Sequence, residues 1–406
     1  MSIRSLNLLF IFLLYTFIFP SQGICGNTTW KNEIRSLAKG GAVLVVDEGG
    51  RELYSLNPAK PLIPASTLKI FTAAAALNFM GSDFHFITEF RLSPEKDLYV
   101  IGRGDPCLIS EELSIIAGKL KSKGLNEVRD ILLDDSYFQP GQMLHGARRS
   151  LNPYDAFNGA LSVNFNTVMV HIDLGGKVNS GEPQTPLTAI ARTAALKTGL
   201  KGKIRLNLAE SPEICLLYSG ELLRKFLEKS SIKVLGKVAR ATGNHKKHPI
   251  YFNHKSRGDL ASILEKMFKY SNNFIANQVF LTMGAVKEPP PASVEKSRRV
   301  MGRFLSNIGI SGLRLEEGSG LSRRNRVTAA QMIKVLDYFR PYRHLLTRKD
   351  RTWFKTGTLR NVASMAGYLD PGHTGIFSFV VILNGKRSCV RSRDRIMALL
   401  KKNLIL

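Results

Sequence analysis

A serine and a lysine three residues apart, Ser66 and Lys69, stand at the start of an almost wholly apolar segment, residues 70–77. Residues three apart share one face of a helix. The N-terminus of a helix also places backbone N–H groups and a positive dipole end beside the serine. Because apolar surroundings disfavour the charged form of a lysine, such a lysine can act as a general base for a hydroxyl. The pair therefore indicates covalent catalysis by an activated serine.

The Ser-x-x-Lys pattern is weak by itself, because it occurs five times in this sequence. Only Ser66 begins an all-apolar helix, where each polar group buried without a partner would cost roughly 1–3 kcal/mol. The other copies lie at a polar helix end, before a proline in a charged loop, or among lysines and glutamates. Their serines are Ser36, Ser93, Ser230 and Ser293.

A second candidate element is Ser271-Asn272-Asn273, which falls within a predicted helical stretch, residues 260–283. The Ser-x-Asn pattern recurs, and Ser162-Val163-Asn164 is the strongest competitor because it lies in a β-rich run. A polar cluster on a helix surface would also explain Ser271. The choice between these copies stays open at this level.

A third candidate element, Lys355-Thr356-Gly357-Thr358, continues a predicted strand. Gly357 lacks a side chain, so a ligand could lie against the strand edge at this point. The backbone N–H of Thr358 could then complete an oxyanion hole with the N–H of Ser66. The tripeptide occurs a second time at 197–199, where lysine and glycine after an alanine-rich run predict a helix C-terminal cap.

Patterns typical of other chemistries are missing from the sequence. The histidines and cysteines show no metal-ligand spacing, and there is no Walker loop, dinucleotide fingerprint or Gly-x-Ser-x-Gly elbow. The cysteines at 25, 107, 215 and 389 are too far apart for a redox pair or zinc ribbon. We therefore expect neither a metal nor another cofactor.

The β-rich runs gather at both ends of the chain and predict an α/β fold. Two runs lie at 42–47 and 52–56, and three more lie at 352–359, 363–369 and 376–383. Neither group is large enough for an independently stable sheet. We expect one five-stranded antiparallel sheet with terminal helices packed on it, formed by residues 24–83 and 255–406. Residues 84–254 are then a large, mainly β insertion.

The chain has 406 residues and a formal net charge of +26, which would attract an anionic polymer or lipid. Arg4 precedes an apolar run at 8–19, which a proline ends, and small residues precede a possible cleavage after Gly23. Residues 1–23 are therefore predicted to be a secretory signal peptide, with an uncleaved anchor as the alternative. We expect an exported, periplasmic protein, and export would separate it from nucleic acid.

The three elements in this order are typical of penicillin-binding proteins and serine β-lactamases. Further stretches resemble the D-alanyl-D-alanine carboxypeptidase/endopeptidase family, the class C low-molecular-mass penicillin-binding proteins. The resemblance covers nearly all of the chain after the signal peptide and implies a penicillin-binding transpeptidase-like domain. The stretches are residues 56–71, Gly104-Asp105-Pro106, residues 160–166 and the loop Gly318-Ser319-Gly320-Leu321-Ser322-Arg323.

The resemblance also implies a role for each site residue. Ser66 would attack the D-Ala-D-Ala carbonyl, Lys69 would accept its proton, and Ser271 would relay a proton to the leaving amine. The substrate would be bound by Asn273, Lys355 and Thr356, next to Gly357 and Thr358. Relatives often use an acidic residue in the insertion to bind the diamino acid of the stem peptide, and Asp155 is a candidate.

The expected partners are peptidoglycan stem peptides, β-lactams as covalent inhibitors, and anionic wall material. Two other functions compete with the peptidase. A serine β-lactamase would need an efficient deacylating base, and no Glu-x-x-x-Asn follows Ser271. A non-catalytic, polyanion-binding wall protein would not need the reactive residues that all three elements retain.

Overall fold

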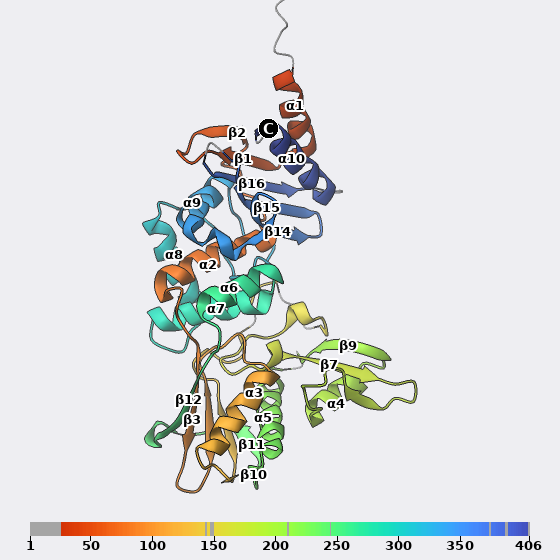
Figure 1. Cartoon of the computed structure of the whole chain (residues 1–406), viewed down its shortest axis with the longest axis vertical. Coiled ribbons are helices and arrows are strands. Elements are labelled where there is room, and N and C mark those ends of the chain that lie inside the picture. The colour runs from red at the N-terminus through yellow and green to blue at the C-terminus, as the bar shows by residue number, and fades with distance from the viewer. Residues whose placement is uncertain are drawn as a thin grey trace, which may run out of the picture.

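The computed structural model describes residues 26–142, 144–146, 150–208, 211–243, 245–372, 375–385 and 389–404. The predicted signal peptide, residues 1–23, lies outside the described residues. Figure 1 shows an elongated molecule with one large sheet and its helices at one end, and a set of smaller sheets at the other. Within the described part of the chain, no helix combines the length and apolarity needed to cross a bilayer.

The large sheet is antiparallel and draws its strands from both ends of the chain, as predicted. Strand β1 pairs with β16, so that Ala42 lies opposite Ile382. Among the described residues the sheet has six strands rather than the expected five, because a short hairpin adds β13 at one edge. In sheet order the strands are β13 (Thr347–Lys349), β14 (Thr352–Leu359), β15 (Val362–Leu369), β16 (Phe377–Asn384), β1 (Ala42–Val46) and β2 (Glu52–Leu56).

Both faces of this sheet are covered by helices, which explains why its central strands are almost entirely buried and mostly apolar. In β1, Ala42, Leu44 and Val46 belong to one core, while Val43 and Val45 belong to the core on the opposite face. Successive side chains of a strand point to opposite faces, so each face needs its own apolar cover. Helices α1 (Gly26–Ala38) and α10 (Cys389–Leu404) cover one face.

The other face carries the helices that hold the candidate site. Helix α2 is buried along most of its length among its neighbours, as its lack of a polar face predicted. These helices are α2 (Lys69–Met80), α6 (Leu260–Lys269), α7 (Asn273–Lys287), α8 (Val294–Asn307) and α9 (Ala329–Phe339).

The middle of the chain forms a separate hydrophobic core, with buried residues between Phe90 and Val234. The chain leaves and returns through neighbouring strands, because β3 pairs with β12 and Ile87 lies opposite Lys255. This region contains substantial helices as well as strands, so it is more helical than the predicted mainly β insertion. Its helices are α3 (Ser110–Ser122), α4 (Ala189–Leu196) and α5 (Pro212–Lys229).

The strands of the middle region form smaller sheets (Figure 1). They are β3 (Ile87–Leu92), β4 (Leu98–Gly102), β5 (Glu127–Val128), β6 (Ile131–Asp134), β7 (Thr167–Ile172), β8 (Val178–Ser180), β9 (Gly202–Asn207), β10 (Lys233–Val234), β11 (Val238–Arg240) and β12 (Ile250–Lys255). Short 3₁₀ helices complete the described chain: η1 (Ala65–Leu68), η2 (Pro153–Asp155), η3 (Asn164–Asn166), η4 (His245–Lys247) and η5 (Arg340–Leu345).

Candidate active site

Ser66 lies in the 3₁₀ turn η1, which leads directly into helix α2. The turn begins with strained backbone, because Ala65 has a φ of 50°. A non-glycine residue in this region costs roughly 1–2 kcal/mol, so surrounding contacts must stabilise it. One such contact is a hydrogen bond from the Ser364 hydroxyl of β15 to the Pro64 carbonyl. Ser66 is partly exposed, while its neighbours Ala65 and Thr67 are buried.

Lys69 is fully buried, and its amine contacts Ser66. Lys69 Nζ lies 3.1 Å from Ser66 Oγ and donates to Asn273 Oδ1 at 2.7 Å and to the Ser319 carbonyl at 2.8 Å. A neutral amine has two N–H bonds and one lone pair. When Asn273 and Ser319 accept both N–H groups, the lone pair is left for the hydroxyl proton of Ser66.

The electrostatics of the site favour this neutral form. The pKa of Lys69 is lowered to about 7, mainly by burial and also by the nearby Lys355 ammonium, while the Glu317 carboxylate acts in the opposite direction. A general base is most effective when its pKa lies near the working pH. Lys69 is therefore suited to accept a proton from Ser66 near neutral pH.

Ser271 and Asn273 lie where one helix ends and the next begins. The predicted helical stretch 260–283 is wrong at this point: α6 ends at Lys269, α7 starts at Asn273, and Ser271 has a φ of 50°. The side chain of Asn272 caps α7 by accepting from Ile275 N at 3.0 Å. The break turns Ser271 and Asn273 towards Ser66, since all three line the same cleft.

The third element lies on β14, beside η1. Thr356 and Thr358 line the cleft with Ser66, whereas Lys355 is buried beneath it and donates to the Thr356 carbonyl at 2.8 Å. Burial, together with the charge of the Arg393 guanidinium, lowers the pKa of Lys355 to about 8. Lys355 is thus the more strongly protonated of the two lysines at neutral pH.

Gly357 has a different role from the one expected. A Cβ at this position would lie 2.8 Å from Ser66 N and 2.8 Å from Pro64 O. The space that its missing side chain leaves is therefore filled by the turn of Ser66, and a ligand does not need to enter it. This contact brings Ser66 N next to the strand that carries Thr358, as a shared oxyanion hole requires.

The competing copies of these motifs have structural explanations. Ser162 donates to the Gly159 carbonyl, and the Asn164 side chain bonds both the N–H and the hydroxyl of Ser110. Lys197 is the C-cap of α4, with Gly199 at a φ of 64°, as the sequence predicted. None of these residues lines the cleft with Ser66.

The cleft has a volume of about 1290 Å³ and extends from Ser66 to the middle region of the chain. Asp155 lines it, and its carboxylate accepts from the Ser150 hydroxyl at 2.6 Å. Arginines and exposed tyrosines complete its walls. Its further lining residues include Tyr154, Tyr270, Leu321, Arg323 and Arg360.

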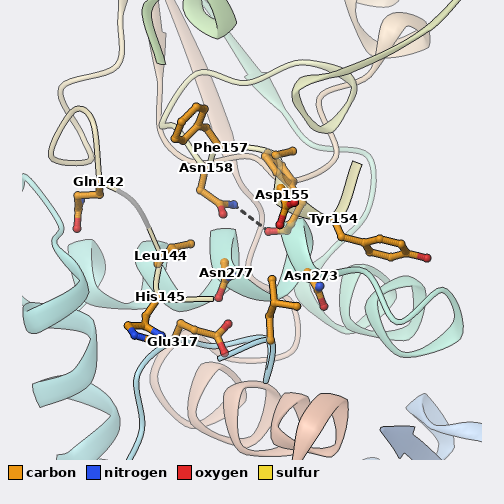
Figure 2. A pocket seen from close by; sticks show the side chains of 13 residues that line it. Gln142, Leu144, His145, Tyr154, Asp155, Phe157, Asn158, Asn273, Asn277 and Glu317 are labelled. Carbon is orange, nitrogen blue, oxygen red and sulfur yellow. Dashed lines mark hydrogen bonds between the residues drawn. The ribbon is translucent and has the colours of Figure 1, made fainter. Parts of the chain in front are cut away.

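The loop that follows α8, residues 317–322, contributes to the site in a way that the sequence analysis missed. It supplies the Ser319 carbonyl to Lys69, and its only acidic residue, Glu317, is fully buried. Figure 2 shows Glu317 beside His145 and below Asn277, with Asn273 close by on α7. The available signal was an acidic residue directly before the Gly-Ser-Gly sequence that the resemblance had already identified.

Within the described residues, no group of three or more histidine, cysteine or acidic side chains is arranged to hold a metal ion. The reactive groups of the site are the serine, lysine and asparagine side chains described above.

Comparisons with known proteins agree on the class and the family. The fold is that of the penicillin-binding proteins: the chain superimposes on the crystal structure of penicillin-binding protein 4 (dacB) from Haemophilus influenzae with a TM-score of 0.75. The match has 21% identity and covers 92% of this chain and 99% of the other. The chain belongs to the D-Ala-D-Ala carboxypeptidase 3 (S13) family, whose model matches residues 31–350.

Two further relatives are similar over most of the chain. A D-alanyl-D-alanine carboxypeptidase from Actinomadura sp. (strain R39) is 28% identical, over 86% of this chain and 78% of its own length. The D-alanyl-D-alanine carboxypeptidase DacB of Haemophilus influenzae is 25% identical, over 81% of this chain and 82% of its own length.

Proposed function

We propose that this chain is an exported serine-type D-Ala-D-Ala carboxypeptidase, with endopeptidase activity on cross-linked stem peptides, that acts through an acyl-enzyme on Ser66. The observation that carries the proposal is the contact of Lys69 Nζ with Ser66 Oγ, Asn273 Oδ1 and the Ser319 carbonyl. This arrangement leaves a lone pair of the neutral amine for the serine proton. Family membership and the names of the relatives supply the substrate class.

In the acylation step, Ser66 Oγ forms a bond to the carbonyl carbon of the penultimate D-alanine and gives its proton to Lys69. The N–H groups of Ser66 and Thr358 stabilise the negative oxygen that develops. The C–N bond to the terminal D-alanine then breaks, and its amine takes a proton through Ser271. Water hydrolyses the ester and regenerates Ser66.

Charge and shape support a peptide with a free terminal carboxylate as the substrate. The buried Lys355 ammonium, with Thr356 at the cleft surface, provides an electrostatic binding site for that carboxylate. Asp155 lies further along the cleft, where a carboxylate can bind the amino group of a diamino acid. The open cleft leaves room for the second peptide of a cross-link.

Two parts of the proposal depend on the sequence. The apolar segment 8–19 supports export to the periplasm, where peptidoglycan is found. β-Lactams are expected as covalent inhibitors, and the related Haemophilus influenzae protein has been crystallised in complex with a β-lactam.

The proposal is tested by labelling the purified protein with fluorescent penicillin and by mass spectrometry of muropeptides before and after incubation. We expect a stable adduct on Ser66, loss of one alanine from pentapeptides, and scission of cross-bridges. Ser66→Ala should abolish all three, whereas Ser36→Ala, in an exposed Ser-x-x-Lys copy on α1, should change none. Persistent labelling of Ser66→Ala would remove the assignment, and rapid turnover of penicillin would indicate a β-lactamase.

A further inference from the structure

Glu317 is a fully buried carboxylate surrounded by hydrogen-bond donors of its own loop. One oxygen, Oε1, accepts from Gly320 N at 2.8 Å, Asn325 Nδ2 at 2.9 Å and Ser322 N at 3.2 Å. The other, Oε2, accepts from the N–H of Ser319 at 2.7 Å and from its hydroxyl. A carboxylate accepts hydrogen bonds on both oxygens and donates none, so it satisfies all these donors together.

The same loop contacts the reactive residues at two points. The Ser319 carbonyl accepts from Lys69 Nζ at 2.8 Å. Gly320 packs so closely on the turn of Ser66 that a Cβ there would lie 1.9 Å from the Ala65 carbonyl oxygen. The loop therefore sets one acceptor of Lys69 and also supports the strained residue before Ser66.

Other contacts fix the loop against α2 and α7. The Thr72 hydroxyl of α2 donates to the Gly318 carbonyl at 2.6 Å, and Gly318 N donates to Asn277 Oδ1 of α7 at 2.9 Å. These bonds hold the start of the loop, whereas Glu317 holds the residues that reach Lys69 and Ala65. Glu317 is thus linked to the turn of Ser66 through Ser319 and Gly320.

We propose that Glu317 is a positioning residue for acylation: its carboxylate holds the 317–322 loop so that the Ser319 carbonyl binds one N–H of Lys69 and directs the amine lone pair at Ser66. This inference rests on the proposed function, because it needs Lys69 to act on Ser66. It adds an acidic residue to the site without giving it contact with the substrate.

Glu317 also acts on Lys69 through its charge. The charged groups that affect Lys69 are Lys355 on β14, which lowers its pKa, and Glu317, which raises it. The uncharged Asn273 of α7 and Ser66 of η1 face it from the other elements. His145 is the titratable neighbour of the loop, through its ring nitrogen and the Ser322 hydroxyl, 2.7 Å apart. Removing the charge of Glu317 therefore lowers the pKa of Lys69 further.

The test compares Glu317→Gln, Glu317→Asp and wild-type protein by the rate of penicillin acylation across pH. Glutamine keeps the size of the side chain but points an NH₂ group at donors, so the loop must shift. We expect Glu317→Gln to acylate roughly 100-fold more slowly, and we expect the rising limb of its pH–rate profile to move to lower pH. Glu317→Asp keeps the charge and should restore the position of this limb and part of the rate.

Glu316→Gln is the matched control, because Glu316 pairs with Arg314 and Arg298 outside the site. It should acylate at the wild-type rate. The positioning role would be overturned if Glu317→Gln acylated at the wild-type rate and with the wild-type pH profile. It would also be overturned if Glu317→Gln were slow but the rising limb of its pH–rate profile had not moved. Failure of the wild-type protein to form an adduct would instead refute the proposed function.

If Glu317→Gln does not fold, Ser319→Ala tests whether the hold of Glu317 on the 317–322 loop affects acylation. This variant removes one donor to Glu317 but keeps the carbonyl that contacts Lys69. We expect a roughly tenfold slower acylation, because the loop is less firmly held. An unchanged rate in Ser319→Ala would overturn the inference in that case.

Discussion

Lys69 and Lys355 show how burial gives two identical side chains different tasks. Burial lowers the pKa of Lys69 to about 7 and that of Lys355 to about 8. Because the pKa of Lys69 is lowered further than that of Lys355, Lys69 loses its proton first as the pH rises. One lysine can then accept a proton while the other attracts a carboxylate.

The first prediction concerns Lys69 as the base. Lys69→Ala should lower the acylation rate by roughly 10²–10⁴-fold, the usual contribution of a general base. Stopped-flow measurement with a fluorescent penicillin gives this rate. Lys39→Ala, in the exposed copy of the motif on the surface, should leave it unchanged. Normal acylation by a folded Lys69→Ala protein would contradict the assignment.

The second prediction concerns pH. Acylation efficiency should rise as Lys69 loses its proton near its pKa of about 7, and fall as Lys355 loses its charge near its pKa of about 8. The profile of kcat/KM for a D-Ala-D-Ala peptide should therefore be a narrow bell between these values. Lys355→Arg keeps its charge to higher pH, so its falling limb should move upward. A falling limb that stays in place would show that another group controls it.

The elements of the site were predictable where a pattern of apolar residues defined them. Helix α2 and the strands from both ends follow from such patterns. The break at Ser271 was not predicted, because the segments on both sides of it have helical sequence patterns and the positive φ of a single residue is not visible in the sequence. The strand β13 was too short to be recognised, and the contact of Gly357 with η1 depends on tertiary packing.

The site residues were predictable to the extent that their chemistry is visible in the side chain. Ser66, Lys69, Asn273 and Lys355 could be proposed from their types and order, and the structure brings them together. The contribution of Ser319 is a backbone carbonyl, which any residue carries, so its identity gives no signal. Glu317 acts through that loop, and its burial is visible only in three dimensions.

The third prediction tests the fit between β14 and η1. In Gly357→Ala the new Cβ would lie 2.8 Å from Ser66 N and Pro64 O, and must displace the turn. We expect a loss of roughly 1–3 kcal/mol in unfolding free energy and slower acylation, measured by denaturant titration and penicillin labelling. Gly118→Ala, in the exposed middle of α3 with open space around it, should instead stabilise by roughly 0.5–1 kcal/mol. Equal effects of the two changes would contradict this packing account.

At the scale of the whole molecule, the net charge of +26 is the dominant electrostatic feature. A field of this sign concentrates anionic polymers around the protein and accelerates encounter with a charged wall. This attraction acts over roughly 10 Å at about 0.1 M salt and is weakened by added ions. This attraction does not depend on the shape of the partner, whereas the cleft near Ser66 can select a substrate by its shape.

The fourth prediction follows from this field. Binding to wall fragments that carry anionic polymer should weaken at least roughly tenfold when salt rises from about 0.05 M to about 0.5 M. Sedimentation of the protein with the fragments measures this binding. Fragments stripped of the polymer should bind weakly at both salt concentrations. An affinity that does not change with salt would refute an electrostatic partner.

The pairing of β1 with β16 joins the beginning of the sequence to its last strand. A chain that is still being synthesised contains Ser66 and Lys69 long before Asn273, Ser319 and Gly357 are available to complete their surroundings. Until β14 and β15 have docked, the turn of Ser66 lacks its contacts with Gly357 and Ser364. The topology therefore makes completion of the site one of the last events in folding, because it has to wait for the C-terminal strands.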